Sequence, residues 1–458
     1  MAYKYSTDQT LHWADPLNME MNMCNHMSMY PAYLSPCSLN YGEDPASPGG
    51  FLNTPIPAVV HLHGGEVPAE IDGGPDSWFT SDGSYKGHAY YSFPAAPSNG
   101  SRFIYPNVQE AAPIWFHNHT LGATRLNVYA GLAGAYLISD PMLTLPRGLA
   151  AYGLDNAGVF EPTIPIVIQD RMFDTTGQLF FPADTAAGLL YALNPEHPYW
   201  VPEFVGDTIV VNGKAWPYLN VLPKRYRFLF LNGFNARTYE MYLLNQATGA
   251  IGPPMYVIAT DGGYLDAPVK LDPVLGQRLL MQPGERYEVI IDFAGYGGTN
   301  LIIRNTARTP FPRGAPPQGS TLGRIMQFRV APGPVQDNTY NPASGIPLRP
   351  AGQKITRLAD PASGTLAPGV FVGKTRLLTL NEVMGMRMNA IDPVTGLLTA
   401  YPGGPLEILV NNTKWSGKRI TGVGPSGMYA TQPIPGFRGD GFGFNYLSEL
   451  PKEGDTEV

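Results

Sequence analysis

The stretch IVVNGKAW, residues 209–216, returns later in the chain as ILVNNTKW at residues 408–415. The two copies align without a gap and share isoleucine, valine, asparagine and tryptophan at matching places. An acidic residue precedes each copy, and in each an apolar run ends at an asparagine, a residue typical of turns. We interpret the copies as equivalent strands near the starts of two related β domains.

Short segments rich in β-branched and aromatic residues surround these copies. Clear examples are PTIPIVIQD (162–170), KRYRFLFLN (224–232) and ERYEVIIDFA (285–294). The 52 glycines and 46 prolines separate such segments at close intervals, which indicates sandwiches or barrels of short strands. Long helical periodicity is rare, and ADTAAGLLYALN (183–194) is the best helix candidate. The sequence therefore predicts an all-β fold.

The length of 458 residues suits about three domains of roughly 150 residues each. We predict a first domain over residues 1–145, with a methionine-rich insert at 18–30, and a second domain over 160–332. A connector rich in proline and glycine follows at 333–373, and residues 374–458 form the N-terminal part of a third domain. Apolar residues make up 44% of the chain, which is enough for a core in each domain.

The composition excludes several classes of function. Charged residues make up only 15% and the net charge is −7, so the chain has no basic footprint for nucleic acid. No apolar run approaches the ~18 residues that a membrane span needs. The opening residues lack the pattern of a signal peptide, and the compartment stays unknown. The two cysteines, Cys24 and Cys37, suit a disulfide about as well as two free thiols.

Two H-x-H pairs carry the strongest chemical signal: His61 and His63 in AVVHLHGGEVP, and His117 and His119 in APIWFHNH. Alternate residues of a strand point to the same face, so each pair presents two imidazoles side by side. Imidazole suits zinc, copper, iron and nickel. The alternative is a set of structural core histidines, but burial without a metal would leave many donors and acceptors unpaired. The pattern therefore favours a metal site.

The chain resembles the multicopper oxidases, in particular the bacterial spore-coat laccase and bilirubin-oxidase branch, in the motifs HLHGG, WFHNH, TRLNVYAGLAGAYLI, VNGKAWPYL, ATDGG and PGERYEVIIDF. The similarity is collinear from about residue 56 onward. The resemblance implies tandem cupredoxin-like domains, which are Greek-key β-sandwiches, with the third domain incomplete. It also implies copper as the cofactor, with a trinuclear cluster between the first and third domains and a type 1 copper in the third.

The resemblance assigns roles to individual residues. It implies that His61 binds the type 2 copper, and that the type 3 pair is bound by His63, His117 and His119. Asp72, eleven residues after His61, would lie near the cluster and assist protonation during dioxygen reduction. The alternative for Asp72 is a loop carboxylate that caps a glycine turn. Packing and orientation of the ligand strands is the role expected of Trp115, Arg125 and Asn127.

Half of the copper ligands that the resemblance implies have no counterpart in this chain. The family's third domain carries an H-P-x-H-L-H motif and an H-C-H motif, but the chain has no histidine after His197 and no cysteine after Cys37. The family's first strands, with a P-G-P-T-I-like segment, also lack a counterpart before residue 56. We therefore expect a chain truncated at both ends and inactive alone, which a missing C-terminal segment or a second chain would complete.

The expected function is that of a laccase-like oxidase. The resemblance implies one-electron oxidation of phenols, aromatic amines, pigments or metal ions, coupled to four-electron reduction of dioxygen to water. Two alternatives stay open: a non-catalytic cupredoxin scaffold, and a copper-binding or copper-tolerance protein. The latter would use the segment NMEMNMCNHMSMY (18–30), whose thioethers either bind Cu(I) or pack as adaptable apolar fillers.

Overall fold

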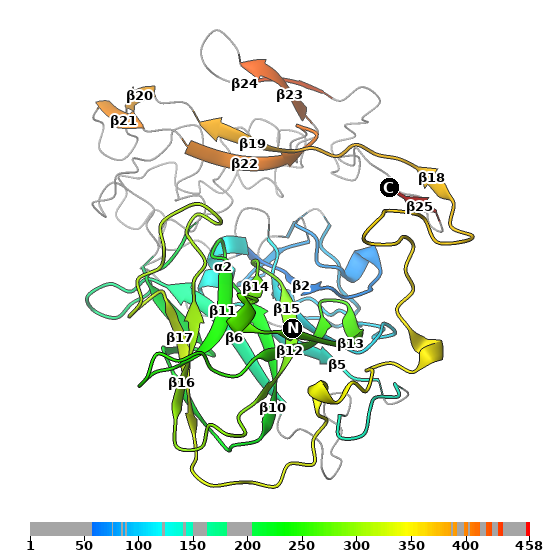
Figure 1. Ribbon diagram of the computed structural model, residues 1–458. Helices are drawn as coiled ribbons and strands as arrows, with labels where there is room; N and C mark the ends of the chain where they lie inside the picture. Colours follow the sequence, from blue (N-terminus) through cyan, green and yellow to red (C-terminus); the bar gives the residue numbers. More distant parts are fainter. Residues whose placement is uncertain are drawn as a thin grey trace.

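Strands make up nearly all of the regular structure, so the predicted all-β class is confirmed (Figure 1). The computed structural model describes residues 57–75, 77–83, 86–87, 89–120, 124–140, 143–149, 163–180, 204–385, 388–391, 398–401, 404–412, 418–423, 429–433 and 455–458. Within these ranges the α-helical structure is α2 (Thr124–Tyr129), and no helix there is long and apolar enough to cross a membrane. Short 3₁₀ helices span Ala69–Ile71, Pro273–Leu275, Pro342–Ser344 and Ala351–Gln353. The predicted helix at 183–194 and the insert at 18–30 lie outside the described residues.

Two sheets form the largest part of the molecule, here called the central sandwich (mostly green in Figure 1). The larger sheet has seven strands in the order β13-β12-β15-β10-β6-β7-β8, with the bounds Gly263–Leu271, Met255–Thr260, Arg286–Asp292, Arg225–Asn232, Ile164–Arg171, Thr208–Val211 and Lys214–Ala215. The smaller sheet has five strands in the order β14-β11-β16-β17-β9, with the bounds Leu279–Met281, Tyr239–Asn245, Asn300–Asn305, Arg324–Val330 and Tyr218–Val221. One buried apolar cluster draws side chains from both sheets and forms the core between them.

A smaller antiparallel sheet of three strands, here called the histidine sheet, packs against the central sandwich. Its order is β2-β4-β5, with the bounds Val60–His63, Ala112–Asn118 and Ala133–Ile138. The register places His61 opposite His117 and His63 opposite Trp115. Helix α2 lies between β4 and β5 in the chain, and the short strands β1 (Pro57–Ala58) and β3 (Phe79–Thr80) pair with each other.

Strand β10 shows how the two parts of the molecule share their apolar surfaces. Its residues Phe228 and Phe230 belong to the core between the two sheets of the central sandwich, whereas Leu229 belongs to a second buried cluster. That second cluster also contains Ala111, the residue before β4, and Tyr340 from the predicted connector. Because both faces of β10 are covered, its residues 228–231 form a continuous apolar run instead of an alternating one. Each buried phenylalanine contributes about 1.5–3 kcal/mol.

The described part of the second repeat, residues 408–412, folds in the same way as residues 209–213 of the first. Asn212 and Asn411 both have a left-handed backbone, with φ of 48° and 51°. The Asn212 N–H donates to Val167 O at 3.0 Å, and the Asn212 side-chain oxygen accepts from Val167 N–H at 2.9 Å. Asn411 makes the same two hydrogen bonds with Thr379, both at 2.9 Å. The sequence repeat is therefore a repeat of one strand-and-turn geometry.

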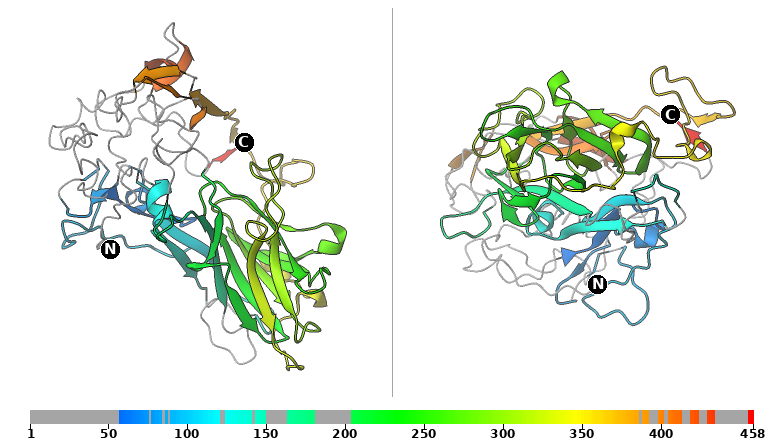
Figure 2. Two further views of the ribbon diagram at one scale, coloured as in Figure 1. Left: turned by 90° about the vertical axis from the view of Figure 1, so that its left-hand side faces the viewer. Right: turned by 60° about the horizontal axis from the view of Figure 1, so that its bottom comes forward.

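The C-terminal strands lie apart from the central sandwich, on the side of the molecule where α2 and β2 lie (Figures 1 and 2). They form four pairs. Strand β18 (Val372–Lys374) pairs with β25 (Thr456–Glu457), and β19 (Leu380–Gly385) pairs with β22 (Gly404–Val410). Strand β20 (Met388–Ile391) pairs with β21 (Leu398–Tyr401), and β23 (Lys418–Val423) pairs with β24 (Tyr429–Pro433). The connector expected at 333–373 packs in part on the central sandwich, because Tyr340 and Leu348 are buried there. The domain boundaries expected from the sequence stay a prediction.

Candidate metal centre

The two H-x-H pairs meet because their strands are neighbours in the histidine sheet. His61 and His63 lie on β2, and His117 lies on β4 directly opposite His61. His119 follows the end of β4, where its N–H donates to O of Val59, the residue just before β2, at 3.0 Å. Alternation along the strands sends the rings to one face. The four predicted histidines therefore converge.

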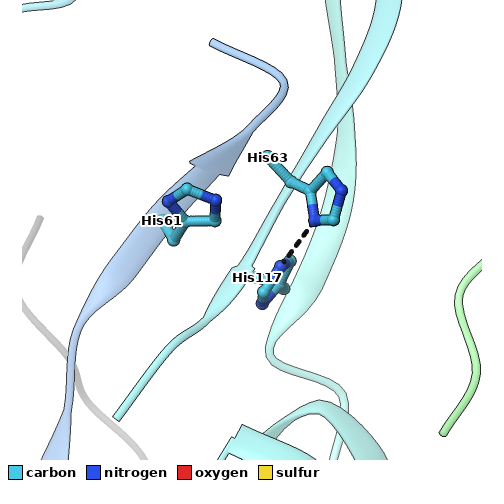
Figure 3. Close-up of side chains that lie close together, drawn as sticks. All are labelled: His61, His63 and His117. Atoms are coloured by element: carbon cyan, nitrogen blue, oxygen red, sulfur yellow. Dashed lines mark hydrogen bonds between the residues drawn. The ribbon is translucent and has the colours of Figure 1, made fainter. Parts of the chain in front are cut away.

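The rings lie close enough for their nitrogens to share one metal or neighbouring metals. Nδ1 of His63 and Nε2 of His117 are 3.1 Å apart (Figure 3). One ring nitrogen from each of His61, His63 and His117 lies within 4.8 Å of the others. The ring centroid of His119 lies 4.8 Å from that of His61 and 5.7 Å from that of His117. Three histidines thus form one group of ligating atoms, and the fourth ring lies against it.

Backbone carbonyls orient two of the rings. Nδ1 of His61 lies 2.7 Å from the carbonyl oxygen of Asp72 and 3.3 Å from its carboxylate. Nδ1 of His117 lies 2.7 Å from the carbonyl oxygen of Asn118. A carbonyl oxygen can only accept, so Nδ1 is the donor in both rings and Nε2 keeps its lone pair. A histidine held in this way presents Nε2 to a metal ion.

Burial keeps most of these rings neutral. It lowers the pKa of His63 and of His117 to about 4, and it also lowers the pKa of His119. His61 differs, because burial acts to lower its pKa but the hydrogen bonds and charge of Asp72 outweigh burial and raise it. The neutral imidazole is the form that binds a metal. At neutral pH His63, His117 and His119 therefore offer imidazole lone pairs instead of positive charges.

The polar groups of the site are incompletely paired. Among the described residues, Nδ1 of His119 and Nε1 of Trp115 are buried without a hydrogen-bond partner. The Trp115 ring lies 5.2 Å from the His63 ring and 4.4 Å from the His117 ring, measured between centroids. The Trp115 nitrogen can only donate a hydrogen bond, whereas the unpaired His119 nitrogen costs free energy that a bond to a metal would offset. A donor set of imidazole nitrogens suits copper or zinc better than calcium or magnesium, so the site fits copper.

One wall of the site comes from the central sandwich, and the sequence did not predict it. The turn before β15 brings Gly284 so close that a Cβ there would lie 3.5 Å from Cε1 of His63. Arg286, at the start of β15, is 4% exposed and donates from Nε to Pro113 O at 3.1 Å. After burial, the charge of Arg286 is the next cause that lowers the pKa of His63. The motif PGERYEVIIDF carries these residues, but nothing in it indicates that its turn faces the histidines.

The other residues expected near the site lie as follows. Asp72 contacts His61, as described above. Asn127 on α2 is buried and its side-chain amide donates to Pro57 O at 3.0 Å, which ties α2 to the segment before β2. Cys24 and Cys37 lie outside the described residues. The metal-binding and catalytic roles of the predicted residues stay predictions.

Curated laccases are similar to this chain, although no profile of a known protein family matches it. It is 40% identical over 278 residues to the laccase of Bacillus stratosphericus, a match that covers 60% of this chain and 48% of that protein. It is 39% identical over 282 residues to the laccase of Bacillus subtilis (strain 168), covering 60% of this chain and 47% of that protein.

A plant relative extends the same similarity. The chain is 36% identical over 349 residues to multicopper oxidase LPR1 homolog 3 of Oryza sativa subsp. japonica, covering 75% of this chain and 56% of that protein. Among solved structures, the McoA multicopper oxidase of Aquifex aeolicus is 25% identical with a TM-score of 0.49, covering 72% of this chain and 58% of that one. The chain spans about half the length of the curated laccases that it matches.

Proposed function

We propose that the chain is a multicopper oxidase along the part that matches these relatives, and that its histidine sheet supplies half of a trinuclear copper centre. The observation that carries this proposal is the convergence of four imidazoles from neighbouring strands, with a buried ring nitrogen unpaired. Copper bound there would supply the electron-transfer chemistry of dioxygen reduction. The residues of the chain hold that copper and keep their rings oriented toward it.

Within this proposal the four histidines divide between two kinds of copper. We assign His61 to the type 2 copper, and we assign to the type 3 pair His63, His117 and His119. The distance of 3.1 Å between Nδ1 of His63 and Nε2 of His117 supports the assignment of both rings to the type 3 copper pair. The contact of His61 with Asp72 supports a separate role for that ring.

We assign to Asp72 the handling of a proton next to the site. Its carboxylate lies 3.3 Å from Nδ1 of His61, and its side chain is 45% exposed, so it reaches both the ring and the solvent. A carboxylate in this place could relay a proton from the acid–base pool of the solvent toward the site. The backbone carbonyl of the same residue holds the His61 ring at 2.7 Å, which separates orientation from proton transfer within one residue.

The activity that we propose is laccase-like. Small donors such as phenols, aromatic amines, pigments or metal ions would lose electrons one at a time, and dioxygen would be reduced to water. The matched relatives carry the names laccase and multicopper oxidase. Because this chain has no histidine after His197, we propose that turnover requires a segment or second chain that supplies the other copper ligands.

Copper binding by the 458-residue chain tests the proposal. The apoprotein is titrated with Cu(II), and bound copper is measured after removal of free metal. We expect the wild-type chain to retain copper and His117→Ala to lose it. We expect His197→Ala to retain copper, since His197 is outside the two H-x-H pairs. Equal copper content in all three proteins would contradict the site.

The same samples test the electron entry point. A blue type 1 site needs a cysteine thiolate with two histidines. Neither Cys24 nor Cys37 lies in an H-C-H motif, so the copper-loaded chain should lack blue absorbance and oxidise phenols no faster than free copper does. Fast phenol oxidation by the chain alone would contradict the requirement for a second segment.

A further inference from the structure

Arg286 is a buried arginine that reaches from the central sandwich into the histidine sheet. Its Nε donates to the carbonyl oxygen of Pro113 at 3.1 Å, at the N-terminal end of β4. Its Nη2 lies against the turn after β2, where a Cβ placed on Gly64 would be only 2.6 Å away. Gly64 directly follows His63, and Pro113 lies two residues before Trp115. One guanidinium group thus touches both strands that carry the histidine pairs.

The guanidinium is itself held in place. Nη1 donates to Gly284 O at 2.9 Å and lies 3.2 Å from the carboxylate of Asp261. The Arg286 backbone N–H donates to the same carboxylate at 2.7 Å. A planar charged group with this many fixed partners loses most of its freedom, so it acts as a rigid connection between its neighbours.

The turn after His63 is contacted from two sides. The side-chain amide of Gln109 donates to Gly64 O at 2.7 Å, and its oxygen accepts from the Glu66 N–H at 2.7 Å. On the other side lies the guanidinium of Arg286. Gln109 stabilises the conformation of the turn itself, whereas Arg286 fixes the position of the turn relative to β4.

We infer that Arg286 is a positioning residue for copper binding, because it sets the separation between His63 on β2 and His117 on β4. Those two rings have nitrogens 3.1 Å apart, and Arg286 braces their strands at the same end of the sheet. The inference rests on the proposed function, since it concerns how that site is held. It also gives the central sandwich a part in the centre, although the sandwich supplies none of the four histidines.

Arg286→Lys in the full 458-residue chain tests the inference. Lysine keeps the positive charge but loses the planar fork that contacts both strands. We expect the affinity for Cu(II), measured by competition with a chelator, to fall about tenfold, as for other residues that orient metal ligands. We also expect a changed Cu(II) electron paramagnetic resonance spectrum, because the geometry of the imidazoles around the metal would differ.

Arg349→Lys is the matched control. Arg349 is 8% exposed, donates from Nε to Tyr264 O at 2.9 Å and pairs with Glu110, so it too is a buried arginine that joins separate segments. Its guanidinium hydrogen-bonds to Tyr264, Gln353 and Glu110, and not to Pro113 or the turn after His63. We expect Arg349→Lys to lower stability but to leave copper affinity and the resonance spectrum as in the wild type.

Asp261→Asn provides a second variant if Arg286→Lys fails to fold. The Asp261 side chain is 51% exposed, so the substitution is mild, but it removes the charge that holds Arg286. We expect weaker Cu(II) binding and a spectral change in the same direction, smaller than in Arg286→Lys. Copper affinity and spectra equal to wild type in this variant would overturn the inference where Arg286→Lys cannot be studied.

The outcomes separate the inference from the proposed function. A change in Arg286→Lys that Arg349→Lys lacks supports the inference. Wild-type copper affinity and spectra in both variants would overturn it and leave the proposed function standing. A wild-type chain that binds no copper at the histidine pairs would overturn the proposed function, and the inference with it.

Discussion

The buried charges of the central sandwich and the imidazoles of the histidine sheet have different kinds of partner. In the central sandwich, buried charges meet their opposites: Arg227 lies 3.0 Å from Glu288 and Arg237 lies 2.6 Å from Asp170, with each side chain at most 2% exposed. In the histidine sheet, buried or half-buried imidazoles meet one another. Opposite charges satisfy one another, whereas neutral rings of one kind leave lone pairs unused. The first arrangement pairs opposite charges within the fold, and the second leaves imidazole lone pairs that suit a metal ion.

The largest effect should come from breaking a pair in the central sandwich. Glu288→Gln leaves the Arg227 charge buried without its counter-charge, and we expect a loss of about 3 to 5 kcal/mol in the free energy of unfolding, measured with urea. The exposed pair of Lys270 and Asp272, 2.8 Å apart, offers a control. Asp272→Asn should leave the unfolding curve unchanged, because exposed ion pairs contribute little. Equal curves for the two variants would refute the contrast.

The histidine sheet should respond to metal in a way that the central sandwich does not. We expect Cu(II) to stabilise the apoprotein by about 2.7 kcal/mol when the free metal exceeds the dissociation constant about 100-fold. His117→Ala should remove this gain. Hydrogen exchange should slow in β2 and β4 on metal addition and stay the same in β10 and β15. Equal slowing in all four strands would mean that the metal acts elsewhere.

Asp72→Asn separates the effect of the Asp72 charge from the orientation of the His61 ring. The backbone carbonyl that holds His61 at 2.7 Å remains, but the negative charge 3.3 Å from the ring is lost. We expect Cu(II) affinity to fall about tenfold. Glu70→Gln is the control, because Glu70 is an exposed acid on the neighbouring 3₁₀ helix. If both variants weaken binding equally, general surface charge explains the effect instead of the contact with His61.

The smallest effect concerns pH. Burial lowers the pKa of His63 and of His117 to about 4, whereas the unfolded chain takes up these protons near pH ~6.5. The unfolded state therefore binds more protons in this window, and apoprotein stability should fall as the pH is lowered, by about 1 kcal/mol in total from pH ~6.5 to ~6.0. His61, whose pKa is raised, opposes the trend. The double variant His63→Gln/His117→Gln should show a flatter dependence, and an unchanged slope would refute the assignment.

Several elements followed from local sequence alone. The alternation of β2 and β4 placed each H-x-H pair on one face, because a strand has a period of two residues. The IVVNGKAW repeat predicted a shared strand and turn, and Asn212 and Asn411 indeed bond to matching strands in the same pattern. Helix α2 was not predicted, because its six residues are too few for a clear helical period. The helix predicted at 183–194 lies outside the described residues and stays a prediction.

The sequence by itself determined which groups this protein can offer: β segments, two pairs of imidazoles and a carboxylate eleven residues from the first of them. Tertiary structure decided what those groups meet. It set His61 opposite His117, put the Asp72 carbonyl on the His61 ring and brought Arg286 against the turn after His63. The physical reason is the separation of the interacting residues along the chain, since side-chain alternation in a strand depends only on adjacent residues. The contact between Arg286 and Pro113 spans 173 positions and exists only once two separate cores have packed together.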